Sequence, residues 1–198
     1  MALFGRKRHY KDMEDAQLVV LAAYDKDAFG ELYERYMPRI YNYIYYRTGN
    51  AHDAEDLTAK VFHRAIGHMK TYEEKGVPFQ AWLYRIAHNL VANFHRDEGR
   101  RKIIPLDDYV AQSLRSEAPE KLLEDSEEKA ALLRAIRRLP QERQDLLVMK
   151  FVDNLSNAEI GSILGRTEGA IKSLYHRTLL ALREEMRPAA PKRLVEER

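Results

Sequence analysis

Apolar residues recur every three or four positions along most of the chain, and stretches in which apolar and polar residues alternate are missing. This spacing lines up apolar side chains on one face of a helix, so the pattern predicts an all-helical fold. In the first half it predicts four helices: from Tyr24 to Tyr36, from Pro38 to a break at Thr48-Gly49-Asn50, from near Asp53 to the loop Thr71–Pro78, and from Phe79 onward. Pro38 is interpreted as a helix start because proline is tolerated in the first turn.

The periodicity weakens between Asp97 and about Ser126, where the chain has many charges, one glycine and two prolines. Such a composition predicts a linker, with a short helix over Tyr109–Leu114. Helical spacing returns over 127–138 and from Glu142 to Val152. We therefore expect an all-α protein of two small helical domains joined by a flexible linker. The expected boundaries are 1–98, a linker over 99–126, a C-terminal domain over 127–187 and a tail over 188–198.

The clearest motif is a helix-turn-helix between Ser156 and Glu184. Ser156 is followed three residues later by Glu159, the spacing of a capping box that opens a short helix. Gly165 suits the left-handed position that ends this helix, and Thr167 can cap the next one. Gly161 permits a close approach of the two helices, and the apolar Ile171 anchors the second.

The second helix of this motif separates its residues into two faces at about 100° per residue. The face predicted to lie in the core carries Ile171, Leu174, Thr178 and Leu182. The opposite face carries Lys172, Ser173, His176 and Arg177. Cations neutralise phosphates and donors discriminate base edges, so this face suits the major groove of duplex DNA. The alternative is a plain helical hairpin with a solvated basic face, but the capping box, turn glycine and apolar anchors together favour DNA binding.

A second candidate nucleic-acid surface lies on the helix after Pro78. Its members share one side of that helix at three- and four-residue spacing: Arg85, Asn89, Asn93 and Arg96. Trp82 stands near the start, directly after a loop, and aromatic rings beside basic and amide groups suit unpaired bases. The loop is able to form a pocket for an extruded base. The alternative, in which Trp82 is a core residue, stays open because its position also fits the apolar stripe.

The composition limits which classes of function remain possible. The charges nearly balance, with 33 Lys plus Arg against 31 Asp plus Glu and a net charge of +2, so a nucleic-acid role rests on where the charges lie. The chain has no cysteine, which excludes thiolate chemistry and cysteine-based zinc sites. It has no signal-like leader and no apolar run of about 20 residues, so a cytoplasmic protein without membrane insertion is expected.

Catalysis has no basis in the sequence. We find no nucleophile–base signature and no glycine-rich phosphate loop, so we expect no enzyme activity, no cofactor and no small-molecule substrate. The acidic cluster around His52 and Asp53 does not have the spacing of a metal site. Acidic residues in the first turn of a helix are explained by the helix dipole, so no metal is expected.

Three stretches, in their order and separation, resemble bacterial sigma factors of the extracytoplasmic-function (ECF) type. They are DAEDLTAKVFHRAI, PFQAWLYRIAHNLVANFHRDEGRR and LPQERQDLLVMKFVDNLSNAEIGSILGRTEGAIKSLYHRTLLALRE. The resemblance covers most of residues 27–185 and is far more specific than a lone helix-turn-helix. It implies a polymerase subunit that confers promoter recognition and melting, with promoter DNA and core RNA polymerase as partners.

The resemblance also implies three groups of site residues. Contacts with the clamp helices of core polymerase are implied for Asp53, Glu55, Asp56, Leu57 and Val61. Capture of the unwound −10 element is implied for Thr71, Tyr72, Phe79, Trp82, Arg85, Asn89 and Arg96. Recognition of the −35 element as duplex is implied for Thr167, Lys172, Ser173, His176 and Arg177. Members of the family are often held inactive by an anti-sigma factor, and they commonly act in stress or envelope-signal responses.

The expected linker has the reach that this role requires. Promoter elements centred about 25 base pairs apart are separated by about 85 Å at roughly 3.4 Å per pair. A linker of about 25 residues spans about 80–90 Å when fully extended. Two alternatives remain: a dimeric helix-turn-helix regulator that acts without being a polymerase subunit, and an enzyme such as a metal-dependent nuclease.

Overall fold

The computed structural model describes residues 10–73, 76–98, 132 and 134–186, and all regular elements among them are helical. The first half contains α1 (Asp15–Ala22), α2 (Lys26–Thr48), α3 (Ala51–His68) and α4 (Phe79–Glu98), with short 3-10 helices over Tyr10–Asp12 and Met69–Thr71. The second half contains helical residues 134–138, α7 (Gln141–Phe151), α8 (Asn157–Leu164) and α9 (Glu168–Glu185). The all-α prediction is confirmed. The expected linker, its short helix and the tail lie outside the described residues.

The predicted helix start at Pro38 is wrong, because α2 continues through this residue. Proline removes one backbone hydrogen bond and frees the carbonyl of Glu34 four residues earlier. Both residues lie on the exposed side of α2, where water can solvate that carbonyl. On the buried side, Tyr36 and Ile40 continue one apolar stripe past the proline, so packing keeps the helix intact.

Helix α2 also begins at Lys26, and Asp25 caps it by accepting hydrogen bonds from two backbone N–H groups. The predicted break between α2 and α3 is confirmed. Gly49 ends α2 in the left-handed conformation, with φ of 65°, which a residue without Cβ adopts at little cost. Asn50 then caps α3, so this helix starts at Ala51, two residues before the predicted position.

The N-terminal helix α1 was not predicted from the sequence. It is tied to α2 through Arg35, which donates hydrogen bonds to the backbone oxygens of Tyr10, Lys11 and Met13. The same guanidinium pairs with the carboxylate of Asp15 at 2.8 Å. This arrangement fixes the segment before α2 against the helical bundle.

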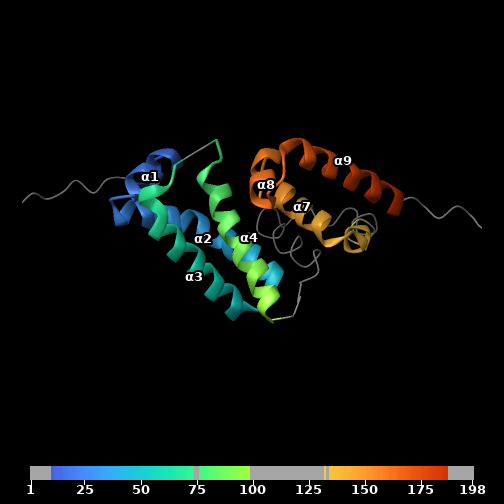
Figure 1. The fold of residues 1–198 in the computed structure, drawn as a ribbon, viewed down its shortest axis with the longest axis horizontal. Helices are drawn as coiled ribbons and strands as arrows, with labels where there is room; N and C mark the ends of the chain where they lie inside the picture. Colours follow the sequence, from blue (N-terminus) through green and yellow to red (C-terminus); the bar gives the residue numbers. More distant parts are fainter. Residues whose placement is uncertain (1–9, 74–75, 99–131, 133, 187–198) are drawn as a thin grey trace, which may run out of the picture.

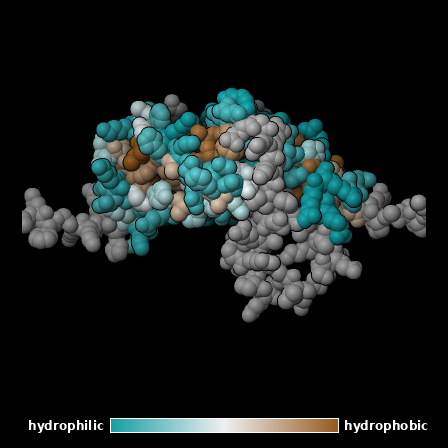
Figure 2. Space-filling view, turned by 90° about the horizontal axis from the view of Figure 1, so that it is seen from below, coloured by the Kyte–Doolittle hydropathy of each residue, from teal (hydrophilic) through white to brown (hydrophobic). Residues whose placement is uncertain are grey.

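The two halves of the chain are in contact with one another. Helix α4 lies along α8, so the helix after the 71–78 loop touches the first helix of the helix-turn-helix (Figure 1). The buried apolar residues of α1–α4 form one continuous cluster with those of α7, α8 and α9, including Leu155 and Ile160. The face drawn in Figure 2 is mostly hydrophilic, with hydrophobic residues surfacing only in small areas.

Candidate nucleic-acid interface

A cleft of about 490 Å³ opens between α3, the 3-10 helix Met69–Thr71 and the first half of α4. Its volume lies within the range of about 300–1,000 Å³ that is usual for ligand sites. Among the residues that the structure describes, those that line it are Arg64, His68, Thr71, Tyr72, Glu73, Trp82, Ile86 and Asn89. Four of the seven residues predicted for the −10 element therefore converge on one cleft.

Aromatic rings form the wall of this cleft. The ring centroids of Tyr72 and Trp82 lie 4.7 Å apart, and Phe79 lies 5.7 Å from Tyr72 and 5.6 Å from Trp82. Phe79 is only 3% exposed and also contacts Tyr36 edge-on. The expected direct contact of Phe79 with DNA is therefore at odds with the structure, in which Phe79 supports Tyr72 and Trp82 from below. Trp82 is partly exposed, so it both packs on the core and faces the cleft.

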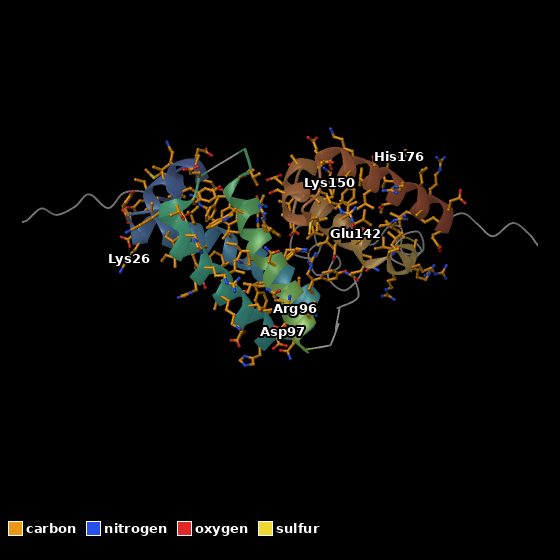
Figure 3. The ribbon with its side chains drawn as sticks, viewed as in Figure 1. Lys26, Arg96, Asp97, Glu142, Lys150 and His176 are labelled. Carbon is orange, nitrogen blue, oxygen red and sulfur yellow. The ribbon has the colours of Figure 1, made fainter. Side chains whose placement is uncertain are left out.

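The polar row predicted on α4 is present at the surface. Arg85, Asn89, Asn93 and Arg96 are all exposed along one side of the helix. Asn89 alone of these four lines the cleft. Arg96, near the C-terminal end of α4, forms an exposed ion pair with the neighbouring Asp97 at 3.4 Å (Figure 3). The row therefore leads from the cleft along the solvent face of α4.

Two basic residues of the cleft were missed in the sequence. Arg64 and His68 both lie on α3 and line the wall of the cleft that this helix provides. Their four-residue spacing puts them on one face of α3, which was a usable signal. The apolar stripe of α3 drew attention to its buried face, and the sequence does not indicate that the opposite face borders the loop.

The helix-turn-helix has the local geometry that was predicted. The hydroxyl of Ser156 accepts a hydrogen bond from the backbone N–H of Glu159 at 3.2 Å, and the Glu159 carboxylate accepts one from the Ser156 N–H at 2.6 Å. Gly165 ends α8 with φ of 66°, and Thr167 caps α9. A Cβ on Gly161 would lie 2.7 Å from the carbonyl oxygen of Arg166, so the close approach is confirmed.

Helix α9 divides into the two faces expected. Ile171, Leu174, Thr178 and Leu182 are buried. Thr167 and the four residues of the predicted recognition face, Lys172, Ser173, His176 and Arg177, are exposed. Figure 3 shows His176 on the outer edge of α9.

The ion pair on the recognition face of α9 is a weak one. Lys172 pairs with Glu168 one turn earlier at 2.7 Å, and both side chains are at least half exposed. Such a surface pair contributes about 0.3–0.5 kcal/mol, so phosphate can replace the glutamate at low cost.

Only some of the residues predicted to bind polymerase, at the start of α3, lie at the surface. Glu55 and Asp56 are exposed and Asp53 is half-buried, whereas Leu57 and Val61 are 4% and 0% exposed in the core. The expected contacts of Leu57 and Val61 with polymerase therefore disagree with their burial. Their packing holds α3 in place instead.

A buried polar group that the sequence did not indicate lies between the two halves. Arg47 of α2 is 4% exposed and donates to the Asp145 carboxylate of α7 at 3.0 Å. Its guanidinium also lies 3.6 Å from the ring centroid of Tyr43 and donates to the Tyr43 carbonyl. Burial is the largest single effect and lowers the pKa of Arg47, but the charges of Asp145, Tyr43, Asp153 and Tyr46 together outweigh it, so the net shift is upward.

Asp153, between α7 and α8, forms the second contact. It is 6% exposed, and its Oδ1 accepts a hydrogen bond from the Tyr84 hydroxyl of α4 at 2.8 Å. Burial raises the pKa of Asp153 to about 6, while the Tyr84 hydrogen bond and the charges of Arg47 and Arg39 oppose the shift. Burial, and then the charge of Arg47, lower the pKa of His88, which also borders this region.

Comparison with known proteins agrees with both halves of this arrangement. Residues 32–101 match the model of Sigma-70 region 2, and residues 129–182 match that of Sigma-70, region 4. The chain is 37% identical over 180 residues to the ECF RNA polymerase sigma factor BldN of Streptomyces coelicolor, covering 89% of this chain and 68% of BldN. It is 31% identical over 174 residues to the ECF sigma factor SigW of Bacillus subtilis, covering 82% of this chain and 91% of SigW.

Solved structures share the fold. CnrH, in complex with the cytosolic domain of CnrY, matches with a TM-score of 0.59 at 21% identity, over 86% of this chain and 95% of that one. The sigma factor RpoE of Bartonella quintana matches with a TM-score of 0.56 at 20% identity, over 84% of this chain and 100% of that one.

Regions 2 and 4 in this order define a sigma factor of the sigma-70 class. The chain belongs to the ECF sigma factors. It is thus a polymerase subunit that binds core RNA polymerase and promoter DNA and directs transcription initiation, and the dimeric regulator is not favoured. The family consists of transcription regulators, which supports a non-catalytic role.

Proposed function

We propose that the cleft beside Trp82 captures an unpaired base of the −10 element and so drives promoter melting. The observation that carries this proposal is the aromatic cleft itself, which joins Tyr72, Trp82 and Asn89. Aromatic faces stack on any base, at about 1–3 kcal/mol per base, and the amide of Asn89 supplies hydrogen bonds for an extruded base edge. Binding of the flipped base offsets the cost of unpairing.

The proposal assigns separate tasks to the residues around the cleft. Arg64 and His68 attract the phosphates of the displaced strand on one side, and Arg85 and Arg96 do so along α4. Thr71 is exposed and lines the cleft, and Phe79 fixes the aromatic wall. Duplex DNA buries base faces in its stack, so this site selects melted over closed promoter.

The exposed face of α9 reads the −35 element in the major groove. Lys172 and Arg177 supply the charge and the bidentate donors, while Ser173 and His176 supply further hydrogen bonds. Thr167 offers phosphate contacts at the N-terminus of α9, where backbone N–H groups point outward. The acidic start of α3, with Glu55 and Asp56, binds the clamp helices of core polymerase.

Three further parts of the proposal concern catalysis, cellular location and regulation. The chain carries out no catalysis of its own, because core polymerase supplies it, and it acts in the cytoplasm, where polymerase and promoter are found. None of the described helices is both long and apolar enough to span a membrane. An anti-sigma factor holds the protein inactive in a stress or envelope-signal response, as NepR is seen bound to the RpoE relative. Recovery of such a partner with the untagged protein from its host tests this last part.

Run-off transcription with purified core polymerase tests the function. We expect a promoter-specific transcript from a library of fragments of the cognate genome, and none from core alone. A folded protein that gives no specific transcript on any fragment, and instead binds a palindromic site as a dimer without polymerase, would refute it.

A further inference from the structure

A second cavity, of about 440 Å³, lies where α2, α4 and α7 meet. Its volume, like that of the cleft beside Trp82, falls within the range that is usual for ligand sites. We propose that this cavity binds a small molecule that carries a diphosphate group. Such binding lies beyond promoter recognition and does not depend on it. The described polar residues that line the cavity are Arg47, His88, His95, Arg96, Gln141 and Asp145.

Helix α4 presents two histidines to this cavity. Most of the residues that α4 contributes share one helical face, at spacings of three, four and seven residues: His88, Val91, Ala92 and His95. Two imidazoles therefore flank a small apolar patch. This face meets the polar row that leads from the cleft beside Trp82 only at Arg96, so the two histidines have no part in that row.

Arg47 lines the cavity on the α2 side. It is only 4% exposed, so a group that contacts it there is largely removed from water, where electrostatic attraction is stronger. The carboxylate of Asp145 also lines the cavity, but its Oδ1 already accepts hydrogen bonds from Arg47 and from the Gln141 side chain, each at 3.0 Å. The exposed pair of Arg96 with Asp97, at 3.4 Å, is weak. Arg96 therefore adds positive charge to a wall in which Asp145 is already balanced, and this favours an anion.

His88 is held in a defined orientation beside this charge. Its Nδ1 lies 3.1 Å from the hydroxyl of the fully buried Tyr43. Burial, and then the charge of Arg47, lower the pKa of His88, so the ring is neutral at pH 7. A neutral ring whose Nδ1 accepts from the tyrosine carries its proton on Nε2, which can donate to an anion. Arg47 affects this pKa more than Asp145 does, which indicates a positive potential in this part of the cavity.

The donors of the cavity are spread too widely for a single phosphate. His88 and His95 are seven residues apart, which is about 10 Å along the axis of α4. A diphosphate carries charge on both phosphates and offers oxygens over a longer span. Its charge-assisted hydrogen bonds to guanidinium and imidazole groups are of the strong kind. Inorganic pyrophosphate and nucleoside diphosphates share this group, and a cavity of this size has room for the rest of a nucleotide.

Histidine signals in nuclear magnetic resonance spectra test the site in the free full-length protein. The chain has seven histidines, of which His88 and His95 line this cavity and His68 lines the cleft beside Trp82. His52 and His63 are exposed on α3, outside both, and serve as internal references. The protein is titrated with pyrophosphate, ADP and GDP at constant ionic strength, and dissociation constants are measured in parallel by calorimetry.

Two variants remove one donor each. His95→Gln and His88→Gln replace an imidazole that lines the cavity, and His63→Gln makes the same change on the exposed surface of α3 as the matched control. Circular dichroism shows whether each variant keeps its helical content. His88 contacts the buried Tyr43, so His95→Gln alone suffices for the test if His88→Gln does not fold.

We expect saturable changes at His88 and His95 with pyrophosphate, and a dissociation constant about tenfold higher or more in His95→Gln, as the loss of a hydrogen bond to a charged group implies. His63→Gln should bind as the natural protein does. Tighter binding of ADP or GDP than of pyrophosphate would identify a nucleotide as the ligand, whereas equal or weaker binding would identify the diphosphate itself. No saturable change at His88 and His95 with any of the three probes, changes confined to His68, or undiminished binding by His95→Gln would overturn the proposal. Core polymerase and promoter DNA are absent from this experiment, so its failure leaves the proposed function intact.

Discussion

The close backbone approach at Gly161 in the helix-turn-helix gives a sharp prediction for Gly161→Ala. Alanine is favoured over glycine in a helix interior by about 1 kcal/mol. Here, however, the new Cβ would lie 2.7 Å from the Arg166 carbonyl oxygen, which is 0.7 Å short of the 3.4 Å at which ordinary contact begins. The obstacle is backbone, and it is held in place because the Arg166 N–H donates to the Gly161 carbonyl at 2.8 Å.

Neither side of this contact yields easily, so the overlap costs about 1–3 kcal/mol, as overpacking of a well-packed site does. Set against the gain of about 1 kcal/mol from alanine, the net result should be a loss of up to about 2 kcal/mol in the free energy of unfolding, with α9 pushed away from α8. Urea denaturation followed by circular dichroism measures this loss directly.

Gly169→Ala is the matched control, because a Cβ there meets nothing within 4 Å. This variant should be neutral or more stable by up to about 1 kcal/mol. The two variants make the same chemical change eight positions apart and are expected to differ in sign. A Gly161→Ala protein that is stabilised as much as Gly169→Ala would show that the turn is not tightly packed and would refute the reasoning.

Three other perturbations test the account elsewhere. Asp153→Asn should flatten the pH dependence of stability. The folded pKa of about 6 lies above the ordinary value of 3.8, so the natural protein should lose roughly 3 kcal/mol relative to the variant as pH rises from about 4 to about 6, where the unfolded carboxyl ionises and the folded one does not, measured by urea titration at several pH values. Ser156→Ala should cost about 1 kcal/mol in urea unfolding through loss of the capping box; an unchanged midpoint would contradict this. Lys172→Ala should reduce the salt slope of −35 duplex binding by the holoenzyme by about 1, whereas Arg183→Ala on the same helix should not.

Features governed by neighbouring residues were predictable from the sequence. The cap at Ser156, the turn at Gly165 and the break at Gly49 each depend on a few adjacent positions, and all three occur as expected. Helix α1 was missed because its apolar residues are consecutive, from Leu18 to Leu21, and show no helical stripe. The predicted helix start at Pro38 was wrong because the packing of α2 overrides the local tendency of proline to interrupt a helix.

Features that depend on distant residues were not predictable. Nothing in the sequence pairs Arg47 with Asp145 across 98 positions, and one buried arginine in a tyrosine-rich helix gives no signal. The cleft was anticipated through Thr71, Tyr72, Trp82 and Asn89, but its second wall was not, because that wall comes from α3. The −10 role of Phe79 was implied by the family resemblance alone, and its burial depends on packing against residues that are distant in the sequence.

The most direct test of the central claim compares Asn89→Ala with Asn93→Ala in the holoenzyme. Both are exposed asparagines on α4, but only Asn89 lines the cleft. Affinity is measured for promoter DNA whose −10 non-template strand is unpaired and for the fully paired duplex. Capture of an extruded base predicts that Asn89→Ala lowers affinity for the unpaired DNA by about tenfold, a loss of about 1.4 kcal/mol, and leaves duplex binding and the Asn93→Ala protein nearly unchanged. Equal effects of the two variants, or an equal loss on both DNAs, would contradict it.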